Sequence, residues 1–173
     1  MKRNLIFISF LLFSMLVSAQ FNRNNLRNQN VRPDTRIQKA PEFNTQKVVG
    51  LNIYDIEKVL KKIGVKKTSD NFKKAASVFK VFNKKNKELS RINTFTFSEV
   101  KKTIEAAQKK TQKTRDASFI QNAYKQMGVS LKDVVQELSK REKQLDADLE
   151  PLLSKKQLKK WKKYKARVRK NKN

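Results

Sequence analysis

The chain of 173 residues contains no cysteine and no histidine, and it has only three glycines and three prolines. Without cysteine the chain cannot form disulfides or iron–sulfur clusters. The added lack of histidine excludes typical structural zinc sites and imidazole bases. Three glycines are too few for the glycine-rich loops that cradle nucleotide phosphates. The composition therefore argues against most enzymes, and we expect no catalytic residues, metal ligands or cofactor.

Acidic residues are also scarce, since 15 Asp and Glu stand against 42 Lys and Arg, which gives a formal net charge of +27. A charge of this size favours anionic partners. The few carboxylates are spaced as helical ion-pair partners, for example Glu137 with Arg141, and suggest no acid–base pair.

The first 19 residues have the order of a secretory signal peptide. Lys2 and Arg3 precede an apolar run from Leu5 to Val17, and the small residue Ala19 follows. A membrane anchor is the alternative, but this run is shorter than the roughly 20 residues that span a bilayer. We expect cleavage after Ala19, export, and no lipoprotein, because no cysteine follows. The processed chain (residues 20–173) loses the two charges of Lys2 and Arg3 and carries +25.

Residues 20–47 are rich in Asn and Arg, contain Pro33 and Pro41, and show no sustained apolar period. Such a segment buries too little apolar surface to offset its ordering entropy, which predicts a disordered arm. We expect residues 48–170 to form a single helical domain and residues 171–173 to form a tail.

Apolar spacing after residue 48 predicts an all-α fold, a helical hairpin or bundle of about four to five helices with no sheet. Asn52 is the expected N-cap of a first helix that ends at Gly64. A second helix should begin near Ser69 or Asp70. A third should begin at the capping box Thr96-x-x-Glu99, with Phe95 and Val100 as its hydrophobic pair.

The segment from Phe97 to Met127 is expected to be helical, with a polar middle at residues 109–115. Gly128 and the following Ser130-x-x-Asp133 predict either a break with a new start or a bend within one long helix. A near-3.5-residue apolar period from 131 to 152 favours a hairpin or coiled-coil seam. Pro151 should end this helix.

One face of the second helix carries Phe72, Phe79, Phe82 and Leu89. Packing within the chain is the simplest interpretation. The alternative is an apolar patch, ringed by lysine, that serves a dimer partner or unfolded client proteins.

The C-terminal segment begins with a capping box formed by Ser154 and Gln157, flanked by Leu153 and Leu158. From Lys155 to Asn173 there are 11 Lys and Arg and no acid. A solvated helix face explains most charge runs. Contact with an anionic membrane is the alternative, because basic amphipathic helices use aromatic anchors. The candidates for this contact are Lys155, Lys156, Lys159, Lys160, Trp161, Lys162, Lys163 and Tyr164. Export disfavours nucleic acid as the partner.

Leu153-Ser154-Lys155-Lys156-Gln157 resembles the Leu-Thr-x-x-Gln motif of the Spy/CpxP family, with Ser in place of Thr. The family usually carries two copies, and this chain has one. The string LEPLLSKKQLKKWKKYK is also similar to the ends of small exported proteins from Bacteroidota. The resemblance implies a periplasmic, ATP-independent chaperone of Gram-negative bacteria, a helical homodimer that holds unfolded or acidic clients without a cofactor.

The sequence therefore predicts an exported holdase of this kind. The alternative is an envelope-associated protein whose basic terminal helix binds anionic lipid or lipopolysaccharide.

Overall fold

Helices form almost all of the chain that the structure describes. The computed structural model describes residues 42–170, and the chain divides into Met1–Lys39 and Ala40–Asn173. The expected signal peptide (1–19), most of the expected arm (20–47) and the tail (171–173) lie outside the described residues.

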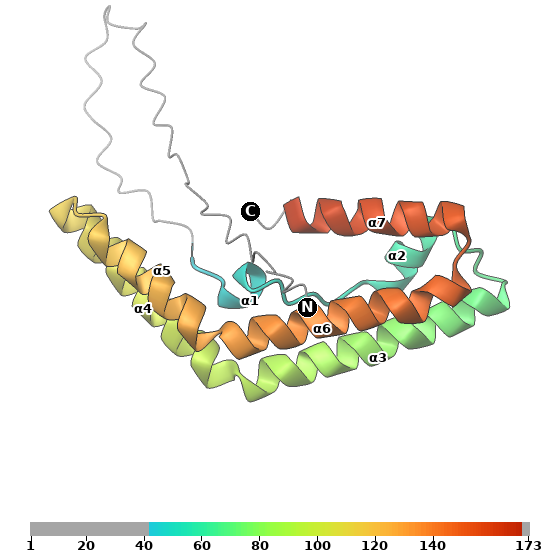
Figure 1. Cartoon of the computed structure of the whole chain (residues 1–173), viewed down its shortest axis with the longest axis horizontal. Coiled ribbons are helices and arrows are strands. Elements are labelled where there is room, and N and C mark those ends of the chain that lie inside the picture. The colour runs from blue at the N-terminus through green and yellow to red at the C-terminus, as the bar shows by residue number, and fades with distance from the viewer. Residues whose placement is uncertain (1–41, 171–173) are drawn as a thin grey trace, which may run out of the picture. The chain divides into compact units, whose positions relative to one another are not determined.

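Seven α-helices and one turn of 3-10 helix follow one another through residues 42–170, and no strand occurs among them (Figure 1). They are α1 (Thr45–Val48), α2 (Ile56–Ile63), α3 (Asp70–Ile92), α4 (Thr94–Thr114), α5 (Ser118–Ser130), α6 (Lys132–Leu149), the turn η1 (Glu150–Leu152) and α7 (Lys155–Lys170). The predicted all-α class is confirmed. The number of helices exceeds the four to five expected, because the long middle segment is divided and the arm contributes α1.

Antiparallel helix pairs account for the packing. Helix α3 packs against α6, and α4 packs against α5 (Figure 1). Helix α2 contacts both α3 and α7, and α1 contacts α4.

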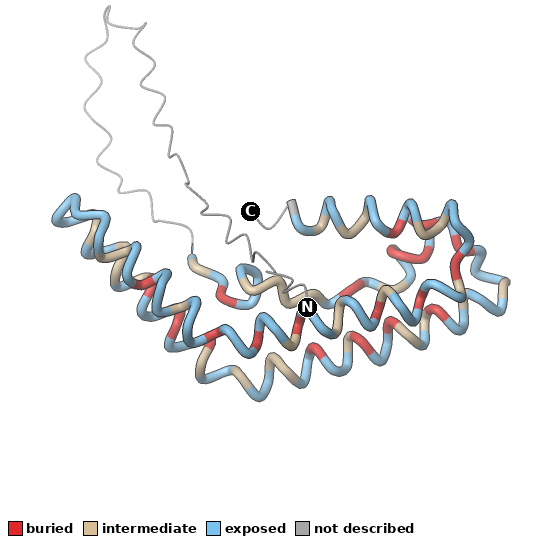
Figure 2. The backbone as a smooth tube through the Cα atoms, in the orientation of Figure 1, coloured by how far each residue is buried: buried red, intermediate tan, exposed pale blue. Residues whose placement is uncertain are grey.

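Two separate clusters of buried side chains form the core. The first joins α2, α3, the end of α6 and α7, and includes Phe79, Leu149 and Trp161. The second joins α4, α5 and the beginning of α6, and includes Ile104 and Leu138. Figure 2 shows the buried positions recurring turn by turn along these helices, as an amphipathic pattern requires.

Three predicted helix limits are confirmed by their local geometry. The Ser69 hydroxyl caps α3 by accepting a hydrogen bond from Phe72 N at 3.2 Å. Gly64 ends α2 in the left-handed conformation at φ 84°, where glycine meets no Cβ penalty. Helix α6 ends at Leu149, and Pro151 lies in the 3-10 turn that follows.

The predicted start of α2 at Asn52 is wrong. Helix α2 begins at Ile56, and the Asp55 carboxylate caps it by accepting from Lys58 N at 3.1 Å. Asn52 instead donates its side-chain amide to Glu142 Oε1 at 3.1 Å. Both residues are good N-caps in isolation, and this long-range contact holds Asn52 in the non-helical segment before α2.

The predicted capping box at Thr96 is also wrong, although the segment is helical as expected. Helix α4 begins two residues earlier, at Thr94, with Asn93 between it and α3. Phe95 is 77% exposed while Val100 is buried, so the expected hydrophobic pair does not form.

The middle helical segment breaks twice, once in its polar part and once just after Gly128, so the predicted break with a new start is present and the single long helix is not. Arg115 is left-handed at φ 58°, and Asp116 accepts a hydrogen bond from Ser118 N at 2.8 Å at the start of α5. Gly128 lies inside α5. A second boundary falls at Leu131, where α6 begins without a side-chain cap, so Ser130 is not the N-cap.

The ordered domain begins before residue 48. Residues 45–48 form α1, and the Thr45 hydroxyl is buried and donates to the Phe97 carbonyl at 3.0 Å. Glu42 pairs with Lys101 on α4. The expected limit of the disordered arm at residue 47 is therefore too late, because these contacts bind the end of the arm to α4.

Replacing Phe79 by Ala should lower the free energy of unfolding by about 3–5 kcal/mol, because its fully buried ring leaves a cavity in the first core cluster. Urea unfolding followed by circular dichroism measures this. The control is Phe95→Ala, which removes an exposed ring from α4 and should change the free energy by less than about 0.5 kcal/mol. Equal effects of the two substitutions would contradict the assignment of the core.

Candidate functional site

Trp161 holds α7 against the rest of the domain. Its indole is 1% exposed and lies in edge-on contact with the rings of Tyr54 and Phe79, with both centroids at 5.4 Å. Its Nε1–H donates to Asp146 Oδ1 on α6 at 2.8 Å. The expectation that Trp161 contacts lipid is wrong in this structure, because core packing takes up the whole side chain.

Tyr164 extends the same aromatic group. Its ring is half-buried and stacks on Trp161 with centroids 6.0 Å apart and planes 17° apart. Burial is the main cause that raises the pKa of Tyr164 above its ordinary value. Lys62 Nζ of α2 lies 5.7 Å from the centroid of this ring. Tyr164 thus contacts α2 and the core rather than projecting as a free anchor.

A partly buried ionic contact strengthens the attachment of α7 to α6. Lys165 donates to the Asp146 carboxylate, at 2.5 Å to Oδ1, and lies 3.9 Å from Glu142 Oε2. The Lys165 side chain is only 11% exposed. Because Asp146 also accepts from Trp161, one carboxylate on α6 binds two successive turns of α7.

Glu142 connects this contact to the segment before α2. Glu142 Oε1 accepts from the Tyr54 hydroxyl at 3.0 Å and from the Asn52 amide at 3.1 Å. Burial raises the pKa of the Tyr54 phenol far above its usual range, and the charge of Glu142 raises it further. Tyr54 therefore stays protonated and serves as a hydrogen-bond donor.

Two asparagines of α3, which our sequence analysis did not select, complete the network. The Asn83 side chain accepts from Tyr54 N at 2.9 Å and donates to Tyr54 O at 2.7 Å. Asn86, which is 1% exposed, donates to the Asn52 carbonyl at 3.0 Å. The signal was present in the sequence, because both amides interrupt the apolar stripe of Phe79 and Phe82.

The predicted capping box at the start of α7 is present. Ser154 N donates to Gln157 Oε1 at 2.9 Å, and Gln157 N donates to Ser154 Oγ at 3.4 Å. Leu153 is buried in the first core cluster, and Leu158 is half-buried against it. The Gln157 amide also donates to the carbonyl of Gly64 at 2.9 Å, so the motif joins the start of α7 to the end of α2.

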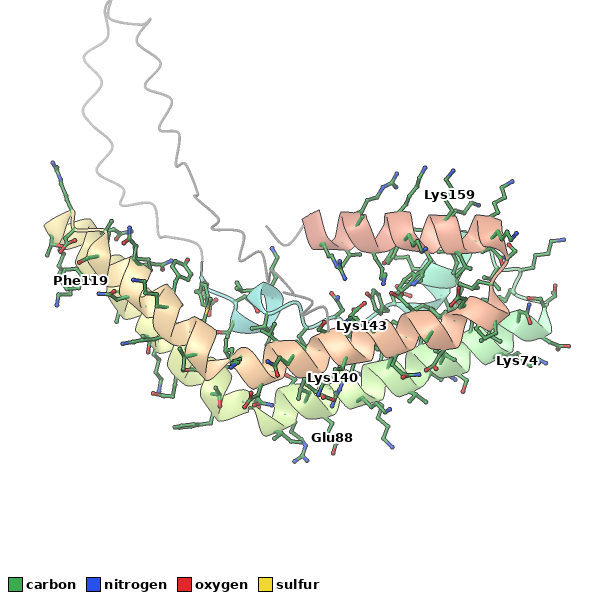
Figure 3. The ribbon with its side chains drawn as sticks, in the orientation of Figure 1. Lys74, Glu88, Phe119, Lys140, Lys143 and Lys159 are labelled. Carbon is green, nitrogen blue, oxygen red and sulfur yellow. The ribbon has the colours of Figure 1, made fainter. Side chains whose placement is uncertain are left out.

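The lysines of α7 cover the side of the helix that this packing leaves free. We call them the α7 basic face: Lys155, Lys156, Lys159, Lys160, Lys162 and Lys163. All six are exposed, and none takes part in an ion pair within residues 42–170. Figure 3 shows Lys159 on the side of α7 away from α6. Because α2 packs against α7, its exposed Lys58, Lys61 and Lys62 add to the charge of this region.

The phenylalanine stripe of α3 packs inside the chain. Phe79 is 0% and Phe82 5% exposed, and half-buried Phe72 packs against the same core cluster. Leu89 is half-buried against the second cluster. The alternative of an exposed client or dimer face is therefore wrong for Phe79 and Phe82, since their partners are residues of the same chain.

Other large apolar side chains are exposed instead. Ile92 and Phe95, on either side of the α3–α4 boundary, are 67% and 77% exposed. Val129, near the α5–α6 boundary, is 79% exposed. The three most exposed large apolar side chains of residues 42–170 thus lie near helix boundaries rather than on the stripe selected from the sequence.

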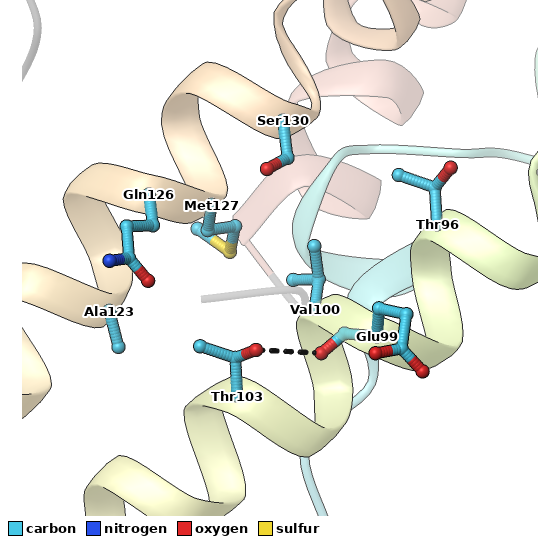
Figure 4. Close-up of a pocket in the computed structure, with 8 residues that line it drawn as sticks. All are labelled: Thr96, Glu99, Val100, Thr103, Ala123, Gln126, Met127 and Ser130. Carbon is cyan, nitrogen blue, oxygen red and sulfur yellow. Dashed lines mark hydrogen bonds between the residues drawn. The ribbon is translucent and has the colours of Figure 1, made fainter.

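A hollow of about 120 Å³ lies between α4 and α5 (Figure 4). Its one carboxylate, Glu99, is paired with Lys102 at 2.9 Å, and its Thr103 hydroxyl donates to the Glu99 carbonyl at 2.9 Å. The hollow therefore holds no free base beside a nucleophile. In residues 42–170 no carboxylates gather into a group able to hold a metal ion.

Comparison with family models, curated proteins and solved structures finds no match for this chain. The resemblance to the Spy/CpxP motif stays a prediction. Within the described part of the chain, no helix combines the length and apolar character needed to cross a membrane.

Replacing Gln157 by Ala should lower the free energy of unfolding by about 1–2 kcal/mol, because both the capping box and the bond to Gly64 are lost. Thermal and urea unfolding measure the change. Gln144→Ala is the matched control, because Gln144 is exposed and its side chain donates to the exposed Asp148 of the same helix. This substitution should lower the free energy of unfolding by less than about 0.5 kcal/mol. If Gln157→Ala lowered the free energy of unfolding no more than Gln144→Ala does, the motif would not hold α7 in place.

Proposed function

We propose that this chain is a cell-envelope binding protein whose α7 basic face holds phosphate-bearing anionic lipid or lipopolysaccharide. The observation that carries the proposal is a row of six exposed lysines without ion-pair partners in residues 42–170, on a helix fixed by buried Trp161. Its setting in the envelope depends on the expected signal peptide.

On this proposal, binding is electrostatic and takes place at the membrane surface without insertion into the bilayer. A basic residue near an anionic membrane surface contributes about 1 kcal/mol, and the attraction falls off within a Debye length. The net charge of the chain adds long-range attraction. Because Trp161 and Tyr164 face the core, α7 binds through its lysines and does not insert its aromatic side chains.

A holdase is the second candidate, and the exposure of Ile92, Phe95 and Val129 favours it. Large exposed apolar side chains near a basic surface suit unfolded, acidic segments of other proteins. On this hypothesis the client contacts residues near the helix boundaries rather than Phe79 or Phe82. The homodimer implied by the family resemblance is part of the same hypothesis.

Lys156, Lys159 and Lys163 lie on the side of α7 opposite Trp161, and their joint replacement by Gln tests the first proposal. Binding of the processed chain to vesicles of phosphatidylcholine and phosphatidylglycerol should fall on the order of a hundredfold, from about 1 kcal/mol per lysine. Co-sedimentation at low salt measures this. The matched control replaces exposed Lys109, Lys113 and Lys125 of α4 and α5, with the same loss of charge. Similar losses in both variants would contradict a specific role for α7.

Light scattering of an aggregating client tests the holdase hypothesis. Capture through apolar groups should persist at high salt, and Phe95→Ser with Val129→Ser should reduce the suppression at least about twofold. The control variant carries Ile53→Ser and Val81→Ser, which remove two other exposed apolar side chains. No suppression by the unaltered chain at near-equal molar ratio would eliminate this candidate.

A further inference from the structure

Helix α3 carries a lysine-lined hollow on the side that adjoins the start of α2. The hollow has a volume of about 350 Å³ and is lined by Ile56, Lys80, Asn83, Lys84 and Lys87. The three lysines are spaced by four and three residues, which places them on one face of the helix. Three positive side chains thus share one concave surface, which we call the α3 lysine hollow.

The charge of this hollow has no partner within the described chain. None of the ion pairs in residues 42–170 includes Lys80, Lys84 or Lys87. The carboxylate of Asp55, next to Ile56, accepts from Lys58 N as the cap of α2. Glu88 lies four residues after Lys84 but forms no ion pair with it. The ammonium groups therefore remain available to an anion from outside.

The floor of the hollow is fixed by hydrogen bonds. The amide of Asn83 bonds to both the N–H and the carbonyl of Tyr54, at 2.9 and 2.7 Å. Tyr54 is itself buried, and Ile56 packs against the first core cluster. The segment that joins Tyr54 to α2 is thus held against α3, so the walls need little rearrangement when a ligand binds.

We propose that the α3 lysine hollow is a binding site for a compact oligophosphate group, such as a diphosphate or triphosphate. Lysine ammonium groups are point charges that donate to phosphate oxygens. Because the lysines are exposed to water, contact with a single phosphate would contribute little binding free energy. Adjacent phosphates of one ligand can instead contact all three lysines at once. The site uses α3 and α2 residues and none of the lysines of the α7 basic face.

Calorimetric titration of the processed chain with inorganic tripolyphosphate at low salt tests this proposal. The variant Lys80→Ala, Lys84→Ala, Lys87→Ala should bind at least about tenfold more weakly, because each charge-assisted contact is lost. The matched control, Lys74→Ala, Lys85→Ala, Lys140→Ala, removes the same charge from exposed positions of α3 and α6 and should change affinity by less than about twofold. Lys74 and Lys140 are labelled in Figure 3.

Equal weakening in the two variants, or no measurable binding by the unaltered chain, would overturn the proposal. Circular dichroism establishes that each variant is folded. If the triple variant is not, the single change Lys84→Ala should still weaken binding about threefold, with Lys85→Ala as its control.

Two further arms identify the source of the phosphate and separate this site from α7. Vesicles of phosphatidylcholine with diacylglycerol pyrophosphate present the group as a lipid headgroup. If the variant Lys80→Ala, Lys84→Ala, Lys87→Ala binds both these vesicles and tripolyphosphate more weakly than the unaltered chain, the ligand is a lipid headgroup. If it loses affinity for tripolyphosphate alone, the ligand is soluble.

The variant Lys156→Gln, Lys159→Gln, Lys163→Gln should keep its affinity for tripolyphosphate within about twofold. A larger loss of affinity would place tripolyphosphate binding on α7 and overturn the proposal of a separate site on α3.

Discussion

The buried contact of Trp161 with Tyr54, Phe79 and Asp146 determines how α7 lies on the domain, and the surface chemistry depends on it. An indole with its ring in the core and its N–H bonded to a carboxylate fixes the rotation of the helix about its axis. Lys165 binds the same carboxylate one turn later. With this side turned inward, the α7 basic face must point to solvent.

Charged side chains thus have different roles near the core and on the surface of the domain. Near the core, the scarce carboxylates join separate elements: Asp146 accepts from Trp161 of α7, and Glu142 accepts from Tyr54 and Asn52. On the surface, lysines greatly outnumber acids, and those of α7 and of the α3 lysine hollow have no ion-pair partners in residues 42–170. Uncompensated surface charge opposes compaction through self-repulsion, and anionic ligands would relieve it. The proposed anion binding therefore offers a reason for a surface charge that stability alone would not favour.

Local rules predicted the features that depend on neighbouring residues. The Ser154 and Gln157 capping box and the Ser69 cap involve side chains that reach backbone only three residues away, and their spacing predicted them. The same spacing at Thr96 and Glu99 did not give a cap, because α4 begins earlier, at Thr94. The inward orientation of Trp161 was not predictable in this way, because membrane contact and core packing both place it on the apolar side of the helix. Asp146, fifteen residues away, decides between them. The same holds for Asn52, whose bond to distant Glu142 outweighs its preference for a helix start.

The fluorescence of Trp161 tests the central claim most directly, because it is the one tryptophan in the chain. The processed chain is mixed with anionic vesicles whose acyl chains carry bromine, a quencher of nearby indoles, and binding is followed in parallel by co-sedimentation. We predict salt-sensitive binding with unquenched emission, since α7 meets the surface through its lysines while Trp161 stays in the core. Binding accompanied by strong quenching would mean that Trp161 leaves the core and inserts into lipid, and absence of binding would remove the membrane as a partner.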